Sequence, residues 1–316
     1  MNNTNTPYDD AFRTLQYDCP NLIIPIVNEI FGEDYTEEDE IIFSPNELYF
    51  QVSNENVEER ITDSTFVIIK KSQNAVRKRR YHMECQSSTD GSISLRMVEY
   101  DALVAIRNGE KTKEGVVIRF PESAVLYLRH NKNTPDKLTI RLETSGGNVS
   151  YTVPVVKVQN YGIEKIFEKK LLFLIPFYIF GYEHEFEAIV SSKEKIQKLN
   201  EEYAMIRRRL DNLCNQGEID EYTKQAIITL TGNVVANLAK KHEAIVKGVK
   251  DNMGGNILEY EAKDILRQGR AEGKMESLLK SVQEVMKNLS VDLTEACRIL
   301  GITTEDYEKA KAIVKQ

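Results

Sequence analysis

The chain has 316 residues, of which 41% are hydrophobic and 29% charged, so it is long enough to bury a sizeable core and lacks a disordered protein's composition. Its formal net charge of −7 argues against a uniformly basic nucleic-acid wrapper, so any affinity for DNA must come from local patches. The sequence has no secretory n-region and h-region, and no Walker, glycine-rich phosphate-loop or G-x-S-x-G motif. We therefore expect a cytoplasmic protein that uses no nucleotide cofactor.

The four cysteines are scattered and form no C-x-x-C pair, so no zinc site is indicated and free thiols are expected. They are Cys19, Cys85, Cys214 and Cys297. Cys85 is interpreted as a small core residue rather than a nucleophile.

The first sixty residues predict two short helices and a strand. Helical spacing from Pro7 to Phe31, interrupted by Pro20 and Pro25, indicates the helices. A strand is predicted near residues 41–52, and further strands follow.

Two β-rich segments come next and carry the most informative residues. Residues 61–69 are rich in β-branched side chains and hold one acid, Asp63, near their start. In residues 81–86, strand alternation places His82, Glu84 and Gln86 on one face and the intervening residues on the other. Consecutive strands of this kind favour an antiparallel hairpin, which would bring the two carboxylates together.

Paired carboxylates of this kind suit a magnesium site for phosphodiester hydrolysis. Mg²⁺ takes oxygen ligands, often one or two carboxylates plus a phosphate, so Asp63 and Glu84 are the predicted ligands and catalytic residues, with Mn²⁺ as a substitute. The Cys85 backbone carbonyl is a further candidate ligand, and the Gln86 amide is predicted to orient water or a phosphate oxygen. His82 is either a direct ligand or, because His favours softer metals, a polar neighbour.

Six basic side chains surround the turn between these two strands and are predicted to contact DNA phosphates. They are Lys70, Lys71, Arg77, Lys78, Arg79 and Arg80. Two other interpretations stay open: the basic residues can form a solvated hairpin tip, or the strand acids can pair with Lys70 or Arg80 on the sheet face.

Residues 92–107 predict an amphipathic helix. Arg96 and Tyr100 lie four positions apart on it, where each can support the catalytic strand or approach a phosphate, and Arg96 is a further candidate DNA contact. Support is the favoured role for Tyr100. Additional strands are predicted near residues 115–119, 124–128, 138–142 and 151–158, with a Gly-Gly turn before the last.

The apolar stretch at residues 171–180 is too short to span a membrane and predicts a buried segment of the core, kinked or divided at Pro176. From residue 191 onward, long charged helical patterns predict a helical hairpin, with helices over 194–213 and 218–246 that pack on the core or on another subunit. A homo-oligomer through this helical half is one expectation.

The C-terminal tail has the pattern of a helix-turn-helix, with helices predicted over residues 293–300 and 304–314 and a break at Gly301. Its second helix carries acids among its lysines and so lacks a basic recognition surface, which favours a packing or oligomerisation module over a DNA reader.

The motifs resemble those of the PD-(D/E)XK nuclease superfamily, in particular the recombination-promoting nuclease (Rpn) family of transposase-like bacterial proteins. Residues 84–90, Glu-Cys-Gln-Ser-Ser-Thr-Asp, resemble that family's E-x-Q-S-S-x-D strand, turn and helix, and residues 96–100 its R-x-x-x-Y continuation. Asp10-Ala11-Phe12-Arg13 resembles its opening D-x-x-F-K segment, with Arg13 where Lys is usual and Asp9 as a competing register. Ile175-Pro176-Phe177 resembles its L-P-F segment, and residues 269–274 resemble its Glu/Gly/Arg-rich tail.

This resemblance implies an α/β fold, a restriction-endonuclease-like mixed β-sheet flanked by helices, with a helical C-terminal extension. The implied organisation is a nuclease-like domain over residues 1–190, a helical hairpin over 191–256 and a helical tail over 257–316. It also implies a metal-dependent DNA endonuclease linked to recombination or mobile elements, with Asp10 as a further candidate metal ligand. Gln86 stands where the superfamily usually has Lys, which lowers the expected rate more than metal binding.

Two functions remain open at this point. The first is a Mg²⁺-dependent DNA endonuclease built on Asp63, Glu84 and Gln86. The alternative is a catalytically inactive nuclease-fold protein that binds DNA or a protein partner.

Overall fold

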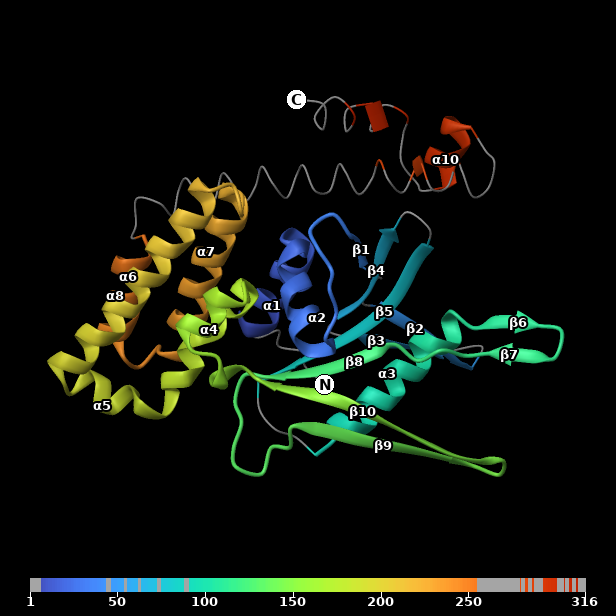
Figure 1. Cartoon of the computed structure of the whole chain (residues 1–316), viewed down its shortest axis with the longest axis horizontal. Helices are drawn as coiled ribbons and strands as arrows, with labels where there is room; N and C mark the ends of the chain where they lie inside the picture. Colours follow the sequence, from blue (N-terminus) through green and yellow to red (C-terminus); the bar gives the residue numbers. More distant parts are fainter. Residues whose placement is uncertain are drawn as a thin grey trace.

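The protein is a mixed α/β molecule built on a six-stranded sheet (Figure 1). The computed structural model describes residues 7–43, 47–53, 56–61, 64–72, 75–87, 91–254 and 292–299, and the single residues 279, 282, 283, 286, 304, 307, 308 and 311. The strands are β1 (Glu40–Phe43), β2 (Glu47–Ser53), β3 (Asn56–Ile61), β4 (Ser64–Ser72), β5 (Ala75–Gln86), β6 (Glu110–Thr112), β7 (Gly115–Val117), β8 (Glu122–Tyr127), β9 (Lys137–Thr144) and β10 (Gly147–Lys157).

Helices flank this sheet and continue beyond it along the chain. They are α1 (Pro7–Asp18), η1 (Pro20–Leu22), α2 (Ile23–Phe31), α3 (Ile93–Arg107), η2 (Val158–Asn160), α4 (Ile163–Glu168), η3 (Leu172–Glu185), α5 (Phe186–Val190), α6 (Lys193–Asn215), α7 (Glu221–Leu238), α8 (Glu243–Met253) and α10 (Leu293–Ile299). The two N-terminal helices and the helix predicted over residues 92–107 are confirmed as α1, α2 and α3.

The main sheet has the strand order β1-β4-β5-β8-β10-β9. Strands β1, β4 and β5 are antiparallel neighbours, so the predicted hairpin is confirmed, with Ser64 opposite Met83 and Ser72 opposite Ala75. Strand β8 runs parallel to β5, and β10 runs parallel to β8. Helix α3 lies on the crossover from β5 to β8, as parallel neighbours require a long connection. The carboxyl ends of β5 and β8 therefore meet at one edge.

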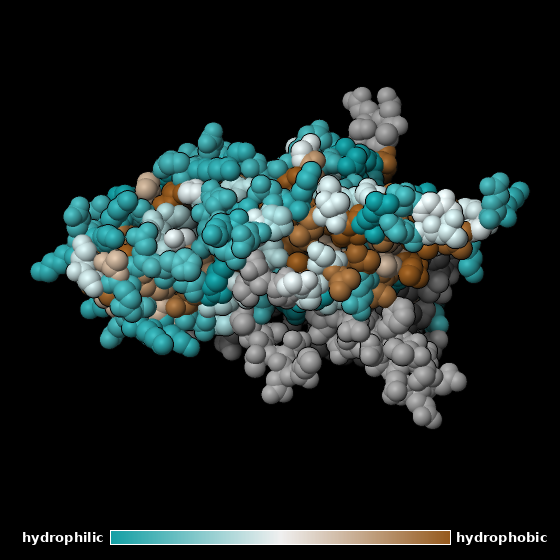
Figure 2. All heavy atoms as spheres, turned by 90° about the horizontal axis from the view of Figure 1, so that it is seen from below, coloured by the Kyte–Doolittle hydropathy of each residue, from teal (hydrophilic) through white to brown (hydrophobic). Residues whose placement is uncertain are grey.

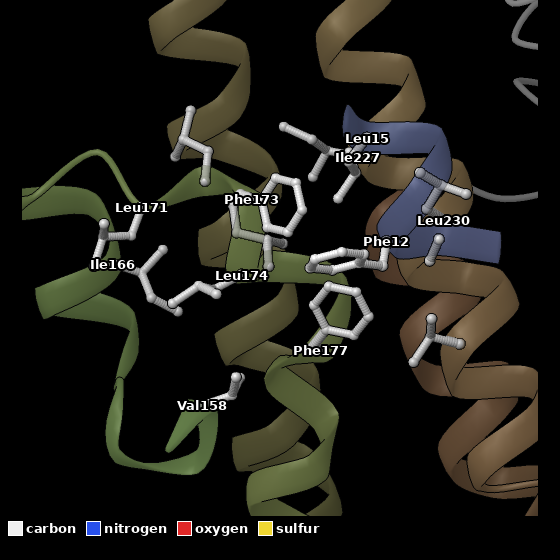
Figure 3. Packing of buried hydrophobic residues seen from close by; sticks show 14 of the residues in the cluster. Phe12, Leu15, Val158, Ile166, Leu171, Phe173, Leu174, Phe177, Ile227 and Leu230 are labelled. Atoms are coloured by element: carbon white, nitrogen blue, oxygen red, sulfur yellow. The ribbon is translucent and has the colours of Figure 1, made fainter. Parts of the chain in front are cut away.

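The larger hydrophobic core covers the sheet face that carries Tyr81, Met83 and Cys85. Helices α1 and α2, the 3₁₀ segment η3 and helices α6, α7 and α8 all contribute to it. At its centre, the ring of Phe12 meets that of Phe173 edge-on at 5.3 Å (Figure 3). The apolar stretch at residues 171–180 is thus a buried core segment, as predicted.

A smaller core covers the opposite face of the sheet, beneath α3. Ile93 and Met97 of α3 pack there with Val125 and Tyr127 of β8 and with residues of β9 and β10. Both faces of the central strands are consequently covered, so polar side chains on β5 are shielded from water.

Helices α6, α7 and α8 gather at one end of the molecule, and the β6–β7 hairpin projects at the other (Figure 1). Apolar positions of all three helices belong to the larger core, which favours packing on the core over packing on a partner. The helix predicted over residues 218–246 is wrong in extent, because α7 ends at Leu238 and α8 begins at Glu243. No described helix is long and apolar enough to cross a membrane.

The strand predicted over residues 41–52 is wrong, because this segment forms two strands in different sheets. Strand β1 pairs with β4, whereas β2 pairs with β3 in a separate two-stranded sheet. The sequence between them contains Pro45, which cannot donate to a ladder. Of the predicted C-terminal tail, α10 agrees with the first helix, and most of the remainder lies outside the described residues.

Candidate functional site

The candidate site is centred on β5, where alternation separates polar from apolar side chains as predicted. His82, Glu84 and Gln86 lie on the α3 side, and the side chains between them enter the larger core. His82 is fully buried and Glu84 is 3% exposed. A carboxylate held so far from water requires hydrogen-bond partners.

Glu84 finds partners on its own strand. His82 Nε2 lies 3.1 Å from Glu84 Oε1, and Gln86 Nε2 donates to Glu84 Oε2 at 3.3 Å. Side chains two residues apart on a strand point the same way, which is why all three meet. Gln86 is predicted to orient water or phosphate; its amide nitrogen points at the carboxylate, and its amide oxygen is a further acceptor.

Helix α3 brings a second acid to the other side of His82. Asp101 is fully buried, and its Oδ1 lies 2.7 Å from His82 Nδ1. Ser123 of β8 donates to the same Oδ1 at 2.7 Å, and the Tyr151 hydroxyl lies 3.5 Å from Oδ2. The imidazole thus bridges two carboxylates that come from a strand and a helix.

The environment of His82 favours its charged form. Burial alone would lower the pKa of His82, but its hydrogen bonds to Asp101 and Glu84 outweigh burial and raise the pKa to about 9. Both ring nitrogens therefore donate, one to each carboxylate. This arrangement favours the prediction that His82 is a polar neighbour of the site rather than a metal ligand.

Tyr100 lies beside this network, with its ring edge-on to the His82 ring at 5.9 Å between centroids. Its position agrees with the predicted supporting role for the strand. Arg96 lies one turn earlier on α3 and is half-buried.

Asp63 is the predicted partner acid, and it lies outside the described residues. It directly precedes Ser64, the first residue of β4, which stands opposite Met83. Asp10 is exposed on α1, whose buried residues pack into the core on the opposite face of the sheet from Glu84. Within the described ranges, no three His, Cys, Asp or Glu side chains are grouped as metal ligands.

The basic residues around the β4–β5 turn are largely paired with acids from the segment between α2 and β1. Glu33 accepts from Arg77 and Arg79, both at 2.5 Å, and the Glu33 side chain is only 7% exposed. Arg77 also stacks over the Tyr35 ring, at 5.1 Å from its centroid. Both guanidinium groups therefore share one carboxylate within the chain, and both side chains stay partly exposed.

Other predicted phosphate contacts are also engaged. Lys70 pairs with Asp34 at 2.9 Å, and Lys71 pairs with Glu40 at 3.2 Å. The two remaining predicted contacts are Arg80, which donates to the Asn108 side chain, and Lys78, which is exposed. The hairpin is thus a network of ion pairs with acids distant in sequence, which the composition of the hairpin alone does not reveal.

Sequence reasoning missed Asp101, Ser123 and Tyr151. A signal for Asp101 was present, because it continues the buried stripe Ile93 and Met97 at intervals of four, where an apolar residue is expected. A charged residue in such a stripe indicates a buried partner. Ser123 has no comparable signal, since its role depends on the pairing of β8 with β5.

No protein-family model matches the chain, and no curated protein or solved structure was found to be similar to it. The resemblance to the Rpn family therefore rests on the residues of its motifs alone.

Proposed function

We propose that this protein is a metal-dependent DNA endonuclease with a restriction-endonuclease-like core, linked to recombination or mobile elements. The observation that carries the proposal is the buried Glu84 carboxylate with Gln86 beside it, at the carboxyl end of β5. In open α/β sheets, ligands bind outside the carboxyl ends of the strands. The motif order of strand, turn and helix also agrees with β5 followed by α3.

The donor set available near Glu84 suits a hard divalent cation. Carboxylate oxygens of Glu84 and Asp63, with the Cys85 backbone carbonyl, are the oxygen ligands that Mg²⁺ or Mn²⁺ accepts. When bound, such a cation supplies Lewis-acid stabilisation of the charge that develops on the phosphodiester.

The chain's own residues have separate tasks in this proposal. Glu84 is oriented by the His82 ring, whose Nε2 lies 3.1 Å from Glu84 Oε1. Gln86 donates to Glu84 through its nitrogen, which leaves its amide oxygen as an acceptor for a proton of the attacking water. Gln86 brings no positive charge to the transition state, so slow cleavage is expected.

The test is cleavage of supercoiled plasmid by wild-type protein and the Glu84→Gln variant, with Mg²⁺, with Mn²⁺ and with chelator. Gln has nearly the shape of Glu, so the variant keeps the packing of the buried site while losing the charge. Nicking or linearisation by wild type alone, abolished by chelator, supports the endonuclease. Equal cleavage by both proteins, or none by wild type, refutes it.

The alternative function is a catalytically inactive nuclease-fold protein that binds a partner, and one observation favours it. Several large apolar side chains are exposed on α3, on β7 and the segment after it, and on β10, and apolar surface gathers right of centre in the view of Figure 2. They are Leu95, Ile106, Val116, Ile118, Phe120 and Val149. Exposed apolar surface that gathers in one region is typical of protein interaction sites. On this alternative, Glu84→Gln leaves the biological effect unchanged.

A further inference from the structure

The side chains behind Glu84 form a continuous hydrogen-bond network. It runs from Glu84 through His82 to Asp101, and Asp101 is held in turn by Ser123 and Tyr151. The contacts nearest the centre are short, at 2.7 Å from Asp101 Oδ1 to both His82 Nδ1 and Ser123 Oγ. Each residue of this network lies on a strand or a helix, so the network is built on the rigid part of the fold.

Stability alone is a weak explanation for this network. Burying charged groups is costly, and replacing a buried ion pair by well-packed apolar residues is often neutral or stabilising. The surroundings would accept apolar residues, because Val125 stands opposite Glu84 on β8, and Met97 lies one turn before Asp101 on α3. Three buried ionisable groups beside the smaller hydrophobic core therefore call for a functional reason.

The geometry supplies such a reason through Glu84. A carboxylate can rotate about its terminal bond, which is a broad torsion with weak intrinsic preference. His82 takes Oε1 and Gln86 takes Oε2, so both oxygens are oriented. The orientation of the His82 ring is fixed in turn by Asp101 on its far nitrogen. Asp101 thus acts on Glu84 through one intervening ring.

We propose that His82 and Asp101 are positioning residues that fix the Glu84 carboxylate for cation binding and phosphodiester cleavage. This inference rests on the proposed endonuclease function and adds to it the residues that orient its central ligand. Outer partners of ligating groups commonly change metal affinity or activity by about 10- to 100-fold when they are mutated. Substitution of Asp101 gives the clearer test of the two, because Asp101 does not touch Glu84 and can act on it only through His82.

The experiment compares wild type with Asp101→Asn, Ser123→Ala and Asp136→Asn. Asp136→Asn is the matched control, since Asp136 pairs with Lys157 through a side chain that is 92% exposed. For each protein, we measure the single-turnover rate of plasmid cleavage, Mn²⁺ binding by calorimetry, and metal-free DNA affinity by fluorescence anisotropy. Near-UV circular dichroism and thermal melting establish that each variant is folded.

The inference predicts that Asp101→Asn lowers the cleavage rate by about 10- to 100-fold and weakens Mn²⁺ binding, with DNA affinity unchanged. Ser123→Ala gives a smaller loss of the same kind, and Asp136→Asn matches wild type. A residue with only a structural role would change the melting temperature without this selective loss.

Results that contradict the positioning role differ from results that contradict the endonuclease function. If wild type cleaves and the folded Asp101→Asn and Ser123→Ala proteins cleave and bind Mn²⁺ equally well, the positioning role is overturned and the endonuclease stands. If Asp101→Asn does not fold, Ser123→Ala decides by the same readouts. If wild type neither cleaves nor binds Mn²⁺, the endonuclease itself is overturned, and the positioning role falls with it.

Discussion

The charged His82 predicts a pH dependence of stability that can be isolated by one substitution. Its pKa is raised to about 9 by hydrogen bonds to Asp101 and Glu84 that outweigh burial, whereas an unfolded histidine has a pKa of about 6.5. Among the residues that the structure describes, the ionisable groups that face the ring are Glu84 on β5 and Asp101 and Tyr100 on α3. Because the folded state holds the proton more tightly, the stabilisation is complete below pH 6.5 and is lost as pH rises through about 9.

The magnitude follows from the two pKa values. The folded and unfolded pKa values of His82 differ by about 2.5. Each unit of pKa difference is worth about 1.4 kcal/mol, so this difference corresponds to about 3 kcal/mol of unfolding free energy. Solvent screening reduces this free energy little, because the His82 ring is fully buried. A loss of this size is a large part of the stability of an ordinary domain.

The assay is urea unfolding followed by circular dichroism from pH 6 to pH 10, in chelator, for wild type and His82→Gln. The variant lacks the titrating ring, so the difference between the two curves removes other groups that titrate in this range. We expect wild type to lose about 3 kcal/mol relative to the variant between these pH values. A difference that stays constant, or that grows in favour of wild type at high pH, refutes a charged His82.

Three further predictions concern the hairpin, the core and a helix end. If the hairpin contacts DNA, Glu33→Gln releases two guanidinium groups and steepens the salt dependence of DNA binding by up to about 1.8 in log–log slope, whereas Glu40→Gln, which releases one lysine, steepens it by up to about 0.9. Phe66→Ala removes a fully buried ring and costs about 3–5 kcal/mol in urea unfolding, against about 0.5 kcal/mol or less for the exposed Leu95→Ala. Asp220→Ala removes the N-cap of α7 and costs about 1 kcal/mol in the same assay.

Each of these predictions has a result that contradicts it. Equal salt slopes for wild type and both glutamate variants mean that the hairpin does not contact phosphates. Similar losses for Phe66→Ala and Leu95→Ala mean that the packing around β4 is not as described. Unchanged stability of Asp220→Ala means that the backbone amide it accepts from finds another partner.

Local patterns in the sequence were sufficient for much of the site. Strand alternation alone places His82, Glu84 and Gln86 on one face, because that period depends only on backbone geometry. Helix α3 was predicted to within one residue of its observed start, since its apolar spacing is regular. The hairpin between β4 and β5 followed from adjacency in the chain.

Features that depend on distant residues were not accessible in this way. Strands β5 and β8 are separated in the sequence by α3, so nothing in either strand specifies that they pair in parallel. The pairing of Glu33 with Arg77 and Arg79 joins residues more than forty positions apart, so the ion-pair network could not be predicted from the hairpin sequence. Contact of these residues with DNA stays a prediction. The part of the site formed by Asp63 stays a prediction, because that residue lies outside the described ranges.

The central claim is a cation-dependent cleavage site formed by two carboxylates, and the most direct test is the rate of plasmid nicking as a function of Mg²⁺ concentration for wild type, Asp63→Asn and Glu84→Gln. We predict saturable, Mg²⁺-dependent nicking by wild type and its loss in both variants. Wild-type rates in either variant, or nicking that does not depend on Mg²⁺, would contradict the claim.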